Sequence, residues 1–121
     1  MALTHVNLLS GLVAQLASSA GVIYDNPNAT KTYIKGIYLF NTSTTTSQTV
    51  KLYIVPNNGA GAVGTAATGN RVLQYTLAPL EALDREFVGL GYVLMAEHDS
   101  LQAEATSATT VTISLSGDLD Q

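Results

Sequence analysis

Short runs of apolar and β-branched residues recur along the whole chain, and turn-forming residues separate them. The clearest run is "TVTISLS" (110–116), in which Val111, Ile113 and Leu115 alternate with threonine and serine. An alternation with a period of two is typical of a strand with one buried face, and many short strands at close spacing are typical of a sandwich. The sequence therefore predicts an all-β fold, a single antiparallel β-sandwich of jelly-roll-like form.

The first 20 residues do not follow this pattern. Gly11 interrupts a set of apolar residues at helical spacing, namely Val6, Leu9, Val13 and Leu16. We expect residues 1–20 to form an extended N-terminal arm, with a short helix as the alternative, and residues 21–121 to form the sandwich domain. With 121 residues, 46% of them hydrophobic, the chain is long enough for one domain with a real core.

Charged residues are scarce, at 12% of the chain, and the net charge is −4. Lysine and arginine together number only five, so no clustered positive charge is available for phosphate, and we expect no nucleic-acid partner. The N-terminal segment lacks a basic stretch and its apolar residues are broken by polar ones, so neither an export signal nor a membrane span is expected. A surface of small neutral side chains is suited to packing against neighbouring molecules.

The chain has no cysteine and two histidines, His5 and His98. His98 and Asp99, together with a serine, match the residue types of a hydrolytic triad, but no motif for an activated nucleophile accompanies them. Glu97, His98 and Asp99 are contiguous rather than spaced to converge on a metal ion. We therefore expect no enzymatic activity, no metal and no cofactor.

Two polar or small-residue segments connect the expected strands. "NTSTTTSQT" (41–49) separates two runs of strong β-propensity, which predicts a hairpin connection. "NNGAGAVGTAATGN" (57–70) matches a dinucleotide-binding glycine pattern only formally, because no helix-forming segment follows it. We expect residues 57–70 to be a mobile loop unless something packs on it.

The run "KTYIKGIYLF" (31–40) is apolar on both faces, whereas a two-layer sandwich covers only one face of each sheet. The remaining face would expose a larger apolar patch than monomers usually tolerate, which predicts a homo-oligomer. The candidate interface residues are Tyr33, Ile37, Tyr38, Leu39, Tyr53 and Val55. The other register of the same strand would place Ile34, Tyr38 and Phe40 on that face.

Several stretches carry a resemblance to a known type of protein. "YIKGIYLFNTSTTTSQTVKLYIVP" (33–56), "GNRVLQYTL" (69–77), "AEHDSLQAEA" (96–105) and "TVTISLSG" (110–117) are similar to the strand and turn signatures of small β-sandwich virion proteins of tailed bacteriophages. The resemblance covers residues 22–117. One departure is His98, where that type usually has glycine before the aspartate.

The resemblance implies a non-enzymatic structural component of the virion. The expected role is a capsid decoration or cement protein, or a head-tail accessory subunit, that docks on the head lattice as an oligomer. Three-fold positions on such lattices imply a trimer, and the major capsid protein or other virion proteins would be its partners. The protein would be assembled into particles in the host cytoplasm.

The alternative is a carbohydrate- or receptor-binding module on a tail or head fibre, because the same scaffold serves both roles. The absence of tryptophan removes the usual stacking surface for sugars and favours the structural role.

Overall fold

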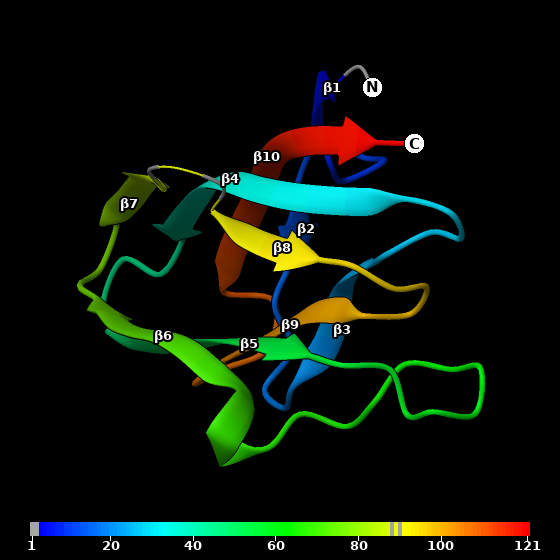
Figure 1. Ribbon diagram of the computed structural model, residues 1–121. Helices are drawn as coiled ribbons and strands as arrows, with labels where there is room; N and C mark the ends of the chain where they lie inside the picture. Colours follow the sequence, from blue (N-terminus) through cyan, green and yellow to red (C-terminus); the bar gives the residue numbers. More distant parts are fainter. Residues whose placement is uncertain (1–2, 88, 90) are drawn as a thin grey trace.

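The computed structural model describes residues 3–87, 89 and 91–121, and it shows two antiparallel β-sheets packed face to face (Figure 1). In the described residues the helical content is one short 3-10 turn, η1 (Thr68–Asn70). No helix there has the length and apolar character needed to cross a membrane. The strands are β1 (Leu3–Asn7), β2 (Ala14–Gln15), β3 (Gly21–Asp25), β4 (Lys31–Asn41), β5 (Gln48–Val55), β6 (Arg71–Leu77), β7 (Ala82–Glu86), β8 (Tyr92–Leu94), β9 (Ser100–Ala105) and β10 (Val111–Asp120).

The topology is that of a jelly roll. The six-stranded sheet has the order β1-β10-β4-β7, with β2 also pairing with β10 and β8 also pairing with β4. The four-stranded sheet has the order β3-β9-β5-β6. If β1 with β2 and β7 with β8 are each counted as one interrupted edge strand, eight strands are distributed over two sheets in the jelly-roll order. The all-β sandwich expected from the sequence is confirmed.

The inner faces of both sheets form one hydrophobic core. Alternate residues of β10 point inward, as their period predicts, and Val111, Ile113 and Leu115 are all buried. They pack with the inner residues of β4, β5 and β9. The fully buried core side chains include Leu16, Ile34, Leu39, Val50, Leu52, Leu77 and Leu101.

The N-terminal segment is extended, as expected, but it is not a free arm. β1 pairs with β10 from Leu3 opposite Asp120 to Asn7 opposite Ser116, so the first and last strands of the chain lie side by side (Figure 1). The turn between β1 and β2 inserts Leu8 and Leu9 into the core, and Leu16 beyond β2 is fully buried. Residues 3–16 therefore pack as part of the sandwich, because this segment pairs with β10 and buries apolar side chains in the core.

The connection over residues 41–49 is not a hairpin, and that expectation was wrong. β4 belongs to the six-stranded sheet and β5 to the four-stranded sheet, so this segment passes from one layer to the other. Ser43 stabilises the turn, since its Oγ accepts hydrogen bonds from the backbone N–H groups of Thr45 and Thr46. The serine and threonine residues of 41–49 therefore stabilise a tight connection between the two sheets and do not extend a strand ladder.

Candidate functional site

The structure divides the six predicted interface residues into two groups. Ile37 and Leu39 lie in the hydrophobic core, and Val55 and Tyr53 are also buried, with Tyr53 only 5% exposed. These four are covered within the single chain, so the interface as drawn from the sequence was wrong for them. Tyr33 and Tyr38 remain at least partly accessible.

A β-bulge in β4 explains the error in the assignment of faces. The pairing of β4 with β10 runs from Ile37 opposite Leu115 to Gly36 opposite Ser116, and then shifts to Ile34 opposite Gly117. Lys35 is the extra residue, and it breaks the period of two. Ile34 and Ile37 consequently both point into the core, which the strict alternation of either register would forbid.

The bulge leaves a strip of uncharged residues on the outer face of the six-stranded sheet. Tyr38 is 40% exposed and lies opposite Ser114 of β10, while Phe40 is half-buried and lies opposite Thr112. We call these four residues the aromatic strip. On the β7 side, Ala82 is opposite Phe40 and Asp84 is opposite Tyr38.

The apolar surface continues from the aromatic strip towards the edge formed by β2. Leu12 and Val13 are 64% and 53% exposed. The Leu12 carbonyl accepts a hydrogen bond of 2.9 Å from Oγ of Ser114, which fixes this segment beside the strip. Leu12, Val13, Tyr38 and Phe40 thus give this face aromatic and aliphatic surface without a charged residue at its centre.

The glycine-rich loop covers part of the outer face of the four-stranded sheet, over Val55 and Gln102. The side chain of Gln102 donates a 2.9 Å hydrogen bond to the Gly64 carbonyl, which holds the loop over β9. A side chain on Gly64 would collide with the Pro56 carbonyl and press on Val55. Residues 57–70 therefore pack on the sandwich through a close backbone approach that glycine permits.

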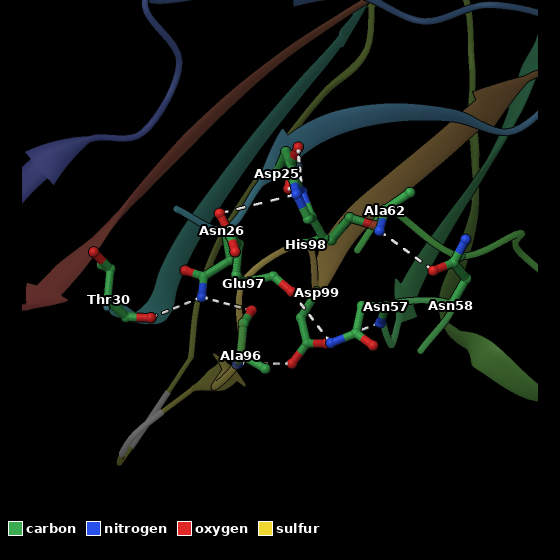
Figure 2. A network of polar contacts seen from close by, with 12 residues as sticks. Asp25, Asn26, Thr30, Asn57, Asn58, Ala62, Ala96, Glu97, His98 and Asp99 are labelled. Atoms are coloured by element: carbon green, nitrogen blue, oxygen red, sulfur yellow. Dashed lines mark hydrogen bonds and ion pairs between the residues drawn. The ribbon is translucent and has the colours of Figure 1, made fainter. Parts of the chain in front are cut away.

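At one end of the sandwich, three connections are joined by a network of polar contacts (Figure 2). The buried side chain of Asn26 donates hydrogen bonds to the carbonyls of Thr30 and Ala96. The carboxylate of Asp99 accepts hydrogen bonds from the backbone N–H groups of Asn57 and Ala96. This network fixes the chain around 26–30, 57 and 96–99, and no sequence motif had indicated it.

His98 lies in this network in the left-handed backbone conformation, with φ of 68°. Its Nδ1 is 3.0 Å from Oδ1 of Asp25, and both side chains are partly exposed. This position is the one at which the resemblance led us to expect glycine. The backbone of His98 has the conformation that glycine adopts without strain, so the turn is retained despite the substitution.

Replacing His98 by glycine should give a more stable protein than replacing it by alanine. Both substitutions remove the contact with Asp25, but only glycine relieves the left-handed strain of the backbone. We expect a difference of about 1 kcal/mol in the free energy of unfolding, measured by urea denaturation. Equal stability of the two variants would contradict the conformational account.

The other histidine, His5, lies near an aspartate and a serine of β10. His5 Nδ1 is 2.8 Å from Oδ1 of Asp118, and Ser116 lies two residues before that aspartate on the same strand. The ring and Ser116 line one hollow with Lys35 and Glu86, but no hydrogen bond joins His5 to Ser116 among the described residues. The same residues contain no group of three potential metal ligands.

Comparison with protein-family models and with curated proteins finds no match for this chain.

Proposed function

We propose that this protein is a non-enzymatic structural subunit of a tailed-bacteriophage virion, which docks on the head lattice as a homo-oligomer. The exposed aromatic strip is the observation that supports the formation of a homo-oligomer. The phage assignment rests on the resemblance of residues 22–117 to small virion proteins.

The aromatic strip supports burial against another protein because its residues combine apolar area with hydroxyl groups. Tyrosine is enriched at protein interfaces since one part of its side chain is apolar and the other forms hydrogen bonds. The hydrophobic core of the chain does not include Tyr38, which is exposed. Folding of the single subunit therefore does not require this side chain. Asp84 at one side provides a polar rim.

Two further features suit repeated docking. The charge content of 12% leaves little electrostatic repulsion between neighbouring copies. The polar connection at 42–47 and the glycine-rich loop at 57–70 lie where strands end, so lattice contacts can form there without disturbing the sheets. Many weak contacts on one particle add up through avidity.

A trimer is the proposed oligomer, because three-fold positions recur on icosahedral lattices and closed symmetry would bury the strip of each copy. Jelly rolls also occur among viral capsid domains, which is a likeness of fold and not of function.

Replacing Tyr38 by lysine should convert the proposed oligomer into a folded monomer. The substitution introduces a charge at the centre of the aromatic strip, where a partner would have to desolvate it. In the free subunit the new ammonium group would face Asp84, so the fold should tolerate it. Light scattering at micromolar concentration would report the molar mass, and co-sedimentation with empty phage heads would report docking.

Val22→Lys is the matched control. Val22 is 44% exposed, close to the 40% of Tyr38, but it lies on β3 of the other sheet. This variant should keep the oligomeric state and the binding to heads. A wild-type protein that is monomeric and folded at the same concentration, or a Tyr38→Lys variant that still assembles, would refute the interface.

A further inference from the structure

A polar hollow lies on the outer face of the four-stranded sheet, away from the aromatic strip. Its volume is about 380 Å³. The centre of its floor is one cross-strand row, in which Lys51 of β5 lies opposite Glu104 of β9 on one side and Gln74 of β6 on the other. The lining residues are Ser18, Thr49, Lys51, Gln74, Glu104, Ala105 and Thr106.

Two side chains of this row are each anchored through one atom and leave a second polar atom available. Oε1 of Glu104 accepts a 3.0 Å hydrogen bond from the Tyr53 hydroxyl and lies 3.7 Å from the Lys51 ammonium. Oε1 of Gln74 accepts a 2.9 Å hydrogen bond from Arg71. Among the described residues, Oε2 of Glu104 and Nε2 of Gln74 have no hydrogen-bond partner.

These hydrogen bonds hold the side chains of Glu104 and Gln74 in place before a ligand binds. The side chains of Lys51 and Glu104 are only 33% and 22% exposed, so neither can move freely into solvent. A pre-oriented polar group binds a ligand without a further loss of side-chain entropy. The carboxylate supplies an acceptor, whereas the ammonium and the amide supply donors.

We propose that this hollow binds one residue of a neutral sugar through its hydroxyl groups. A sugar hydroxyl can both donate and accept hydrogen bonds. In this row, Glu104 can accept a hydrogen bond, and Lys51 and Gln74 can donate one. The row spans three neighbouring strands, or about 10 Å between its outer members, which accommodates one sugar ring with its hydroxyls.

The charges of the lining favour a neutral ligand over an anion. Lys51 and Glu104 form an ion pair, so the charged residues of the lining sum to zero. The lining has no exposed aromatic ring, because Tyr53 is buried beneath the guanidinium of Arg71, whose carbon lies 5.6 Å from the ring centroid. Recognition would therefore depend on hydrogen bonds, and a single site should bind weakly.

The test is a titration of the full-length protein with methyl glycosides of glucose, galactose, mannose and N-acetylglucosamine at millimolar concentration. Binding is monitored through the backbone amide chemical shifts in NMR spectra. We expect at least one sugar to shift the amides of residues 49–51, 74–76 and 104–106. Glu104→Gln should weaken that binding by about tenfold or more, since a charged acceptor is lost. Gln74→Ala should weaken it too, and this variant should still fold because Gln74 is exposed on the edge strand β6.

Glu97→Gln is the control, because Glu97 is an exposed carboxylate in a turn outside the hollow. It should leave the titration unchanged. Shifts with inorganic phosphate but with none of the sugars would overturn the proposal in favour of an anion site. Absence of any shift, or shifts that both Glu104→Gln and Gln74→Ala leave intact, would also overturn it. None of these outcomes depends on the oligomeric state or on binding to phage heads.

Discussion

Replacing Asn41 by alanine should lower the free energy of unfolding by about 3 kcal/mol or more, because several buried backbone groups would lose their partner. Asn41 ends β4 and is fully buried. Its Nδ2 lies 2.9 to 3.2 Å from the carbonyl oxygens of Thr46, Leu77 and Ala78, and its Oδ1 accepts a 3.0 Å hydrogen bond from the N–H of Ser43. One side chain therefore holds the crossing between the sheets and the link from β6 to β7.

Two further variants separate this role from a simple loss of packing. Asn41→Asp keeps the shape but replaces the donor by an acceptor that faces three carbonyl oxygens, so it should destabilise at least as much as alanine. Asn28→Ala changes an exposed asparagine in another turn and should cost less than about 0.5 kcal/mol. Urea denaturation gives all three values. An Asn41→Asp variant as stable as the wild type would contradict the donor role.

The strands were predictable because their signal is local. The run 31–40 lies within β4, and the run 110–116 overlaps the first part of β10. In β10 the alternation of Val111, Ile113 and Leu115 gives the buried face directly. A half-buried strand carries this pattern in its own residues, so no knowledge of its neighbours is needed.

The faces of β4 were not predictable in the same way. The extra residue Lys35 is defined only by the strand that pairs with it, at the shift between Ser116 and Gly117 of β10. A sequence that is apolar on both sides does not reveal where a bulge changes the period. This is why Ile37 and Leu39 were expected at a surface and lie in the core.

The polar hollow and the buried asparagines depend on contacts between distant segments. Lys51, Gln74 and Glu104 are far apart in the sequence, and only the pairing of β5 with β6 and β9 places them in one row. Asn26 and Asn41 appear in the sequence as ordinary turn residues. Their burial follows from the jelly-roll connections that meet at each end of the sandwich.

Replacing Gly117 by alanine should destabilise the protein by about 3 kcal/mol, because the new methyl group has no space at the bulge. A Cβ at this position would collide with the carbonyl oxygen of Tyr33 and lie 3.1 Å from Cδ1 of Leu8. The carbonyl belongs to the backbone of β4 and cannot turn away as a flexible side chain would. Relief would require β4 and β10 to separate where Gly117 is opposite Ile34.

Gly69→Ala is the matched control, since it adds the same methyl group where nothing lies within 4 Å. Neither glycine has a positive φ, so the comparison isolates the steric effect from backbone strain. Thermal and urea unfolding should show a large loss for Gly117→Ala and little change for Gly69→Ala. Equal stability of the two variants would mean that β4 and β10 are not in close contact at the bulge. The two inward positions Ile34 and Ile37, and with them the outward position of Tyr38 in the aromatic strip, would then lose their structural basis.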